Sequence, residues 1–256
     1  MANTVFNNKV IEAKAKDLLT TKVNTRSLMT VDNELAQEAG MTKTINVYTY
    51  TGAAEEVGAG EGNTTRGSIA YVGTDYTVKL VQQVFDYQDE DFMKDPTIVD
   101  NGVIGATQTM TNKMTADFVA ECGKATLTVA KGAEGLSYDN IVDAISEINV
   151  EDESKLIVLI PNEWKADLRK DPDYVAARMG EVVYNGQVGT VAGLPVIASK
   201  AVTEAYVFSP EAIKLFLKKD VEVEQDRDSD TRTNSVYLRA AYLVALVDAT
   251  KICSIK

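Results

Sequence analysis

The fold of this 256-residue chain is decided by residues 45–87, INVYTYTGAAEEVGAGEGNTTRGSIAYVGTDYTVKLVQQVFDY. Ile45, Val47 and Thr49 alternate with polar neighbours at one end, and Tyr76, Val78 and Leu80 do so at the other. Alternation with a period of two predicts two strands, which can pair as a hairpin.

Between the two strands lies a glycine-rich, acidic insert, residues 52–67 (GAAEEVGAGEGNTTRG). Glycine loses the most backbone entropy on ordering, so this insert is not expected to be held by its own domain. A long hairpin that does not bury itself suggests a partner. Its candidate contacts are the charged residues Glu55, Glu56, Glu61 and Arg66.

Length and composition indicate a globular protein of one large or two moderate domains, since 45% of the residues are hydrophobic. The net charge of −12 argues against general nucleic-acid binding, which needs clustered Lys and Arg. Histidine is absent, which removes the commonest general base and metal ligand. Cys122 and Cys253 are expected to be buried free thiols. Without a leader or a window of ~20 apolar residues, we expect a soluble, cytosolic chain with no membrane contact.

The longest helix is predicted for residues 97–122, where Asp95 and Pro96 favour a helix start. Such a long helix with two internal glycines needs tertiary packing along its length. Residues 8–20 predict a short amphipathic helix or arm, and nothing in the first ~35 residues resembles a strand. The apolar stripe of the long helix is Val99, Val103, Ala106, Met110, Met114 and Phe118.

An alternating α/β pattern begins near Thr126. Ser137 is expected to cap a helix carrying Ile141, Ile145 and Ile148, and residues 155–160 predict a buried strand. Helices are also predicted after Pro161 and after Ser209, the second carrying Ile213, Leu215 and Phe216. Short strands are predicted at 194–198 and 206–208, and residues 220–256 read as β structure.

Three motifs could carry chemistry, and each is better explained without it. Gly58, Gly60 and Gly62 lack the Lys-Ser/Thr and the helix of a phosphate-binding loop. Asp226, Asp228 and Asp230 have the spacing that starts a calcium loop, but Thr231 and Tyr237 replace its Gly and Glu. The acidic group Asp86, Asp89, Glu90, Asp91 and Asp95 favours capping of the long helix. We therefore predict no catalytic residue, cofactor or metal.

The order of these pieces resembles the major capsid protein of tailed bacteriophages, of the Hong Kong 97 type. The closing region carries much of the resemblance: SPEAIK (209–214), VEVE (221–224), Arg227-Asp228 and VYLRAAY (236–242). The resemblance implies an α+β fold with an N-arm (1–44), an E-loop (45–80), a P-domain (81–132 and 217–245) with the spine helix, and an A-domain (133–216 and 246–256).

The resemblance also implies a function: self-assembly as pentamers and hexamers into an icosahedral head, a virion component made in the bacterial cytoplasm, around double-stranded DNA bound without sequence specificity. A portal protein, a possible decoration protein and a separate scaffolding protein are implied as partners, since the chain has no room for a scaffolding segment. An acidic wall would repel packaged DNA rather than trap it. The turn residues Arg227, Asp228, Asp230 and Arg232 are further candidates for contacts between subunits.

Two other functions stay open at this point. An encapsulin-like shell shares the implied fold at similar length. A carboxylate-dependent enzyme built on the α/β block is a different class, against which stand the absent histidine and the long helix.

Overall fold

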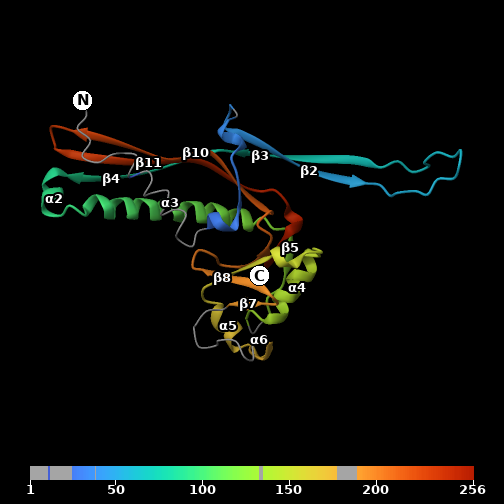
Figure 1. The fold of residues 1–256 in the computed structure, drawn as a ribbon. Helices are drawn as coiled ribbons and strands as arrows, with labels where there is room; N and C mark the ends of the chain where they lie inside the picture. Colours follow the sequence, from blue (N-terminus) through green and yellow to red (C-terminus); the bar gives the residue numbers. More distant parts are fainter. Residues whose placement is uncertain (1–10, 12–24, 38, 133–134, 178–188) are drawn as a thin grey trace.

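The structure is a computed structural model that describes residues 11, 25–37, 39–132, 135–177 and 189–256. Figure 1 shows three parts: a platform of strands lying along one long helix, a hairpin that projects from the platform, and a compact α/β block beneath them. The predicted arm at residues 8–20 lies outside the described residues except for Ile11, which is buried. No helix in the described ranges is long and apolar enough to span a membrane.

The platform is a four-stranded sheet in the order β1-β10-β11-β4. Its centre is the antiparallel pair β10 (Ile213–Asp228) and β11 (Thr233–Leu246), and β4 (Lys79–Gln88) runs antiparallel to β11. At the other edge β1 (Thr30–Asp32) pairs in parallel with β10. The expectation that the first ~35 residues hold no strand is therefore wrong, because this three-residue strand is defined by its pairing with β10, which the local pattern does not reveal.

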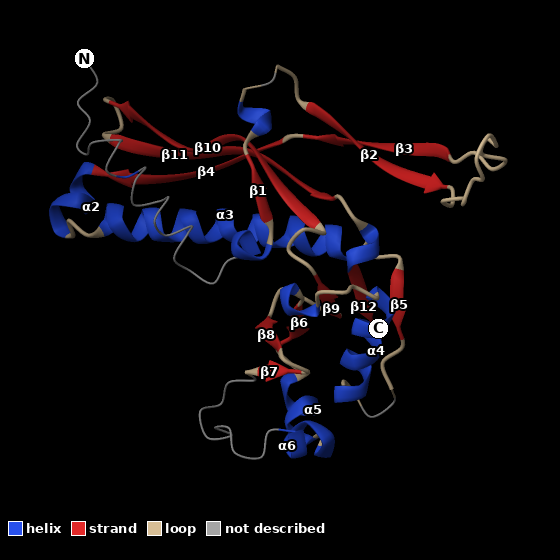
Figure 2. Cartoon of the chain, turned by 45° about the vertical axis from the view of Figure 1, so that its right-hand side comes forward, coloured by secondary structure: helices blue, strands red, loops and turns tan. Residues whose placement is uncertain are grey.

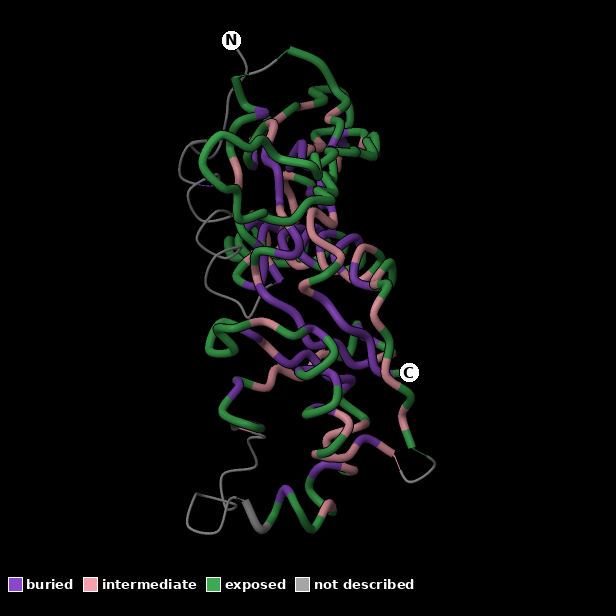
Figure 3. Tube along the Cα trace, turned by 90° about the vertical axis from the view of Figure 1, so that its right-hand side faces the viewer, coloured by how far each residue is buried: buried purple, intermediate pink, exposed green. Residues whose placement is uncertain are grey.

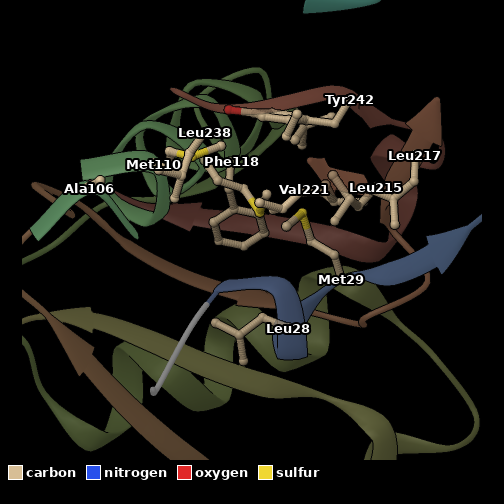
Figure 4. Close-up of a cluster of buried hydrophobic side chains, with 14 of the residues drawn as sticks. Leu28, Met29, Ala106, Met110, Phe118, Leu215, Leu217, Val221, Leu238 and Tyr242 are labelled. Carbon is tan, nitrogen blue, oxygen red and sulfur yellow. The ribbon is translucent and has the colours of Figure 1, made fainter. Parts of the chain in front are cut away.

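Helix α3 (Ile98–Cys122) packs on one face of this sheet, and all six residues of the predicted apolar stripe are buried. Figure 4 shows Met110 and Phe118 of the helix beside Leu238 and Tyr242 of β11, with Leu215 and Val221 of β10. Gly102 permits close contact with the sheet, because a side chain there would meet the Phe85 ring. Tertiary packing therefore sustains this helix despite its glycines, as predicted.

The start of α3 differs from the prediction. The helix begins at Ile98 after Thr97, and Asp95 is not its N-cap. Asp95 Oδ1 instead accepts hydrogen bonds from Thr97 N at 2.9 Å and Thr97 Oγ1 at 2.7 Å, which lower its pKa. Of the acids before it, Asp89, Glu90 and Asp91 form the first turn of a separate short helix, α2 (Asp89–Lys94), where negative charge is favourable, and Asp86 lies in β4.

The projecting hairpin consists of β2 (Thr42–Thr51) and β3 (Ser68–Thr77), which form a two-stranded sheet of their own. Val47 pairs with Val72, which confirms a hairpin around a glycine-rich tip. The second predicted strand is displaced, since Leu80 lies in β4 and pairs with Ala241 of the platform. The alternation simply runs on from β3 into β4, so pattern alone could not locate the change of partner.

The α/β block holds a six-stranded sheet in the order β5-β12-β9-β6-β8-β7. Figure 2 shows α4, α5 and α6 in this block, and Figure 3 shows buried chain at its centre. Its elements are β5 (Leu127–Val129), α4 (Tyr138–Ile148), β6 (Ile157–Pro161), α5 (Lys165–Lys170), α6 (Pro172–Ala177), β7 (Thr190–Val191), β8 (Leu194–Ser199), β9 (Ala205–Phe208) and β12 (Ile252–Ile255). Single 3-10 turns lie at η1 (Thr25–Leu28), η2 (Glu34–Ala36), η3 (Glu153–Lys155) and η5 (Ala249–Lys251).

Most local predictions for this block are confirmed. Ser137 caps α4 with a reciprocal pair of bonds, Asn140 N to Ser137 Oγ at 3.2 Å and Ser137 N to Asn140 Oδ1 at 3.1 Å. The predicted strands appear as β6, β8 and β9. The helix expected after Pro161 begins only at Lys165, because Pro161 still belongs to β6.

The helix predicted after Ser209 is wrong. A single turn, closed by Ala212 N to Ser209 O at 2.9 Å, leads directly into β10. Ile213 and Leu215 face the core under α3, whereas Phe216 faces a second cluster on the other side of the sheet. A strand buried on both faces gives a continuous apolar run, which periodicity cannot distinguish from a helix.

Both cysteines are buried free thiols, as predicted. Burial raises the pKa of both thiols, that of Cys253 to about 11. Neither is therefore ionised at neutral pH.

Candidate functional site

The hairpin is left largely exposed by the fold of its own chain. In β2, Ile45 at the root is the buried residue, and every residue from Asn46 onward is exposed. All of β3 except Tyr76 is exposed as well. An isolated two-stranded hairpin is marginal in water, so this one is suited to gaining stability from a partner.

Its two faces differ in chemistry, because directly paired residues of antiparallel strands share a face. One face presents an aromatic patch in which Tyr48 is paired with Tyr71 and Tyr50 with Ile69. These four side chains are 65–70% exposed, and the Tyr48 and Tyr71 ring centroids lie 6.1 Å apart. The opposite face carries the Val47–Val72 pair. An exposed patch of several large apolar and aromatic side chains is typical of an interaction surface.

The hairpin tip is closed by bonds of its own. Glu55 accepts hydrogen bonds from Thr64 Oγ1 at 2.5 Å, Thr64 N at 2.8 Å and Thr65 N at 3.1 Å. The Thr64 hydroxyl and these backbone amides lower the pKa of Glu55. All four predicted contact residues of the tip, Glu55, Glu56, Glu61 and Arg66, are exposed, and Glu55 is in addition bonded within the tip.

Tyr50 lies where the paired strands end and the glycine-rich tip begins. Its side chain lies over Gly52 and Gly67, and a methyl group on Gly52 would come within 2.5 Å of the Tyr50 hydroxyl. These two glycines therefore provide close approach as well as flexibility.

The charged turn between β10 and β11 is tied to α2 of the same chain. Arg227 contacts Asp89 at 2.5 Å and Arg232 contacts Glu90 at 2.9 Å, while Asn234 Nδ2 donates to Asp89 Oδ1 at 2.7 Å. Both predicted arginines thus have partners inside the chain. Arg227 and Asp89 lie 138 residues apart in the sequence.

The acids of the same turn shape the backbone. Asp228 accepts from Asp230 N at 2.9 Å and from Thr231 Oγ1 at 2.8 Å, and these two bonds lower its pKa. Asp230 is exposed. Among the residues that the structure describes, no group of three acids, cysteines or histidines could hold a metal ion.

Sequence reasoning missed a buried acid in α3. Asp117 accepts from Lys79 Nζ at 2.7 Å, Lys113 Nζ at 3.0 Å and the Tyr242 hydroxyl at 3.0 Å. Burial alone would raise its pKa, but the bonds from Lys79, Lys113 and Tyr242 outweigh burial and lower it. The available signal was an acid directly beside Phe118 on the apolar stripe.

A surface hollow of about 490 Å³ lies on the α/β block, lined by Lys155, Glu211 and Lys251 among others. Lys251 Nζ donates to Glu211 Oε2 at 2.8 Å, and this bond lowers the pKa of Glu211. A paired, ionised carboxylate is poorly suited to donate a proton as a general acid.

Comparison with known proteins adds independent information. No model of a known protein family matches the chain. The sequence is 25% identical over 242 residues to the major capsid protein of Staphylococcus phage phiMR11, covering 90% of this chain and 85% of that protein.

Solved structures of similar fold come from several sources. The capsid of Ralstonia phage GP4 has a TM-score of 0.72 at 8% identity, covering 89% of this chain and 86% of that one. A structure from Mycobacterium phage Che8 has a TM-score of 0.63 at 17% identity, covering 88% and 89%. A virus-like particle from Pyrococcus furiosus has a TM-score of 0.67 at 10% identity, covering 97% and 98%. The chain therefore has the α+β, Hong Kong 97-type capsid fold, and the predicted resemblance to the major capsid proteins of tailed bacteriophages is confirmed.

Proposed function

We propose that this chain is a major capsid protein whose copies assemble, as pentamers and hexamers, into an icosahedral phage head around double-stranded DNA. The observation that carries the proposal is the projecting hairpin, whose aromatic face is 65–70% exposed in a chain with a capsid fold. A neighbouring copy that covers this face would supply the burial that the hairpin lacks.

The regions of the subunit follow from the same proposal. Residues 1–44 are the N-arm, 45–80 the E-loop, 81–132 and 217–245 the P-domain, and 133–216 with 246–256 the A-domain. The expected boundary at residue 217 falls inside β10, whose pairing with β11 starts at Ile213. That pairing favours moving the P-domain boundary to Ile213.

Contacts between subunits are proposed at both ends of the platform. At the hairpin, Glu56, Glu61 and Arg66 are exposed and free to meet charges of a neighbour, as is the aromatic face. At the β10–β11 turn, Asp230 is exposed, whereas Arg227 and Arg232 are engaged with α2 and act by holding the turn in shape.

The wider setting is proposed from the resemblance. The protein is a structural component of the virion, made in the bacterial cytoplasm, without enzymatic activity. Its partners are further copies of itself, a portal protein, a scaffolding protein, a possible decoration protein and DNA contacted without sequence specificity. An acidic subunit suits a wall along which DNA moves.

A shell of the encapsulin kind is the second candidate, because the fold alone does not separate it from a phage head. The sequence similarity to a phage major capsid protein favours the head. The paired Glu211 gives the enzyme alternative no support.

Electron microscopy of the purified protein tests the proposal directly. We expect closed shells or capsomers, and a small monodisperse particle under every assembly condition would contradict it. Tyr48→Ser with Tyr71→Ser should strongly reduce shell yield without changing the melting of the subunit, because both side chains are exposed. Val142→Ser, an exposed apolar position on α4, is the matched control and should leave the yield unchanged.

Removal of residues 54–65 tests the tip separately. We expect a folded subunit that fails to form stable shells, since the deleted segment contacts mainly itself through Glu55. Shells of normal yield and stability would show that the tip has no part in assembly.

A further inference from the structure

The hairpin leaves the platform at one residue, Val78, which separates β3 from β4. Successive side chains of an extended chain point to opposite faces, so Val78 and Lys79 lie on opposite sides of the sheet. The direction of the hairpin therefore depends on what holds these two residues.

Val78 is held on the face away from α3. It is 4% exposed and belongs to a small apolar cluster, which we call the root cluster. The members of the root cluster are Leu35, Ile45, Val78, Phe216, Ala241, Leu243 and Ala245. Val78 N also donates to Met41 O at 2.7 Å, which continues the pairing of the hairpin.

Lys79 is held on the opposite face by Asp117 of α3. Lys79 pairs directly with Tyr242 across β4 and β11, so the two side chains stand next to each other on that face. Both donate to the Asp117 carboxylate, Lys79 to Oδ1 at 2.7 Å and Tyr242 to Oδ2 at 3.0 Å. The Asp117 side chain is only 7% exposed, so its charge requires these donors.

The last turn of α3 and the residues just after the helix reach the same root. Glu121 Oε2 accepts from Leu246 N at 3.3 Å, and Lys124 Nζ lies 5.0 Å from the centre of the Tyr76 ring in β3. Lys124 and Glu121 are themselves paired at 2.7 Å. The end of α3 contacts β4 through Lys79, and the turn that follows the helix contacts β3 through Tyr76.

We propose that Asp117 is a positioning residue that, through Lys79, clamps the root of the hairpin to α3 and so sets the direction in which the hairpin reaches a neighbouring subunit. The second clause rests on the proposed function, whereas the clamp itself is a property of the single chain. The partner of the clamped hairpin is a second copy of this chain.

The chain offers a matched pair of variants. Lys79 and Lys113 both donate to Asp117 Oδ1, and their side chains are 53% and 52% exposed. Lys113 lies on α3 itself, one turn before Asp117, so of these two lysines only Lys79 joins the helix to the strand at the root of the hairpin. Lys79→Met and Lys113→Met remove the same charge and a similar ion pair, but only the first opens the clamp.

The experiment measures the direction of the hairpin in unassembled subunits at low concentration. Spin labels are placed at the exposed positions Thr49→Cys on the hairpin and Asn101→Cys on α3, since both native cysteines are buried. Electron–electron resonance then gives the distribution of distances between the labels. Hydrogen exchange of the Val78 amide reports opening of the root.

We expect Lys79→Met to broaden the distance distribution and to speed exchange at Val78 on the order of threefold, the effect of losing one partly exposed ion pair. Lys113→Met should change neither, and Lys79→Arg should restore both. Asp117→Asn should broaden the distribution at least as much as Lys79→Met. Equal distributions for Lys79→Met and Lys113→Met would overturn the clamp.

Assembly yield separates the clamp from the proposed function. A broadened hairpin with reduced shell yield supports both. A broadened hairpin with normal yield keeps the clamp and contradicts its role in assembly. Shells that never form in the wild-type protein would contradict the proposed function while leaving the distance measurement intact.

Discussion

At the scale of single residues, Asp117 shows how a charge is kept inside this fold. Its three donors come from β4, α3 and β11, so the carboxylate is satisfied only when the sheet and the helix are packed. Removing the Asp117 carboxylate would take this hydrogen bond from the Tyr242 hydroxyl, and a buried polar group left unsatisfied costs about 1–3 kcal/mol. The loss falls on Tyr242 because this residue is only 1% accessible to solvent, so water cannot replace the missing partner.

Asp117 should make subunit stability depend on pH in the acid range. Its pKa is lower in the folded chain than the ordinary value of 3.8, so its contribution is present above about pH 4 and is lost as pH falls through the folded pKa. Burial, with the charge of Asp117 beside it, raises the pKa of Tyr242, so this hydroxyl stays protonated in the acid range and does not reverse the sign. We expect Asp117→Asn to lower the free energy of unfolding at pH 7, with the difference from wild type shrinking below pH 4. Urea titrations at several pH values measure this, and a difference that stays constant with pH would contradict it.

At the scale of elements, α3 shows that two glycines in one helix have different reasons to be there. A methyl group on Gly102 would meet the ring of Phe85 in β4, whereas one on Gly105 would meet nothing within 4 Å. Gly102 therefore allows the helix to lie close to the sheet. Gly105 lowers the stability of the helix, and no contact within the subunit requires a glycine there.

Alanine at these two positions should act in opposite directions. Gly105→Ala should raise the free energy of unfolding by about 0.5–1 kcal/mol, because alanine loses less backbone entropy in a helix. Gly102→Ala should lower it by about 1–3 kcal/mol through overpacking against Phe85. Thermal melting of the two variants beside wild type gives both values, and the same sign for both would contradict this account.

At the scale of the whole molecule, charge opposes the assembly that the exposed hairpin favours. Each chain carries a net charge of −12, so copies repel one another at long range. Many of the cations are already paired within the subunit, as Arg227, Arg232 and Arg239 are with acids of α2 and β10. Apolar contact must therefore drive association, and the solvent must screen the repulsion.

Assembly should be promoted by moderate salt. Raising the ionic strength from about 0.01 M to about 0.15 M shortens the screening length from about 30 Å to about 8 Å, which removes most long-range repulsion. We expect faster and more complete assembly by light scattering over this range. Equal assembly at the two ionic strengths would show that opposite charges across the interfaces already balance the net charge.

The sequence by itself determined the elements whose signals are local. The period of α3, the capping box at Ser137, the strands of the α/β block and the glycine-rich tip all depend on neighbours a few residues apart. The resemblance to phage capsid proteins followed from the order of these elements. Of the candidate site, the exposed tip charges and the mixed charges of the β10–β11 turn could be named from their composition.

Only the tertiary structure decided which partner each element has. Residues 76–80 alternate without a break, yet the chain changes from the hairpin to the platform at Val78. The run after Ser209 has the apolar content of a buried helix and becomes β10, because each face of the sheet there is covered by a different cluster. The pairs Arg227–Asp89 and Lys79–Asp117 join residues 138 and 38 positions apart. Such contacts arise from packing between distant segments, so the pattern of neighbouring residues cannot predict them.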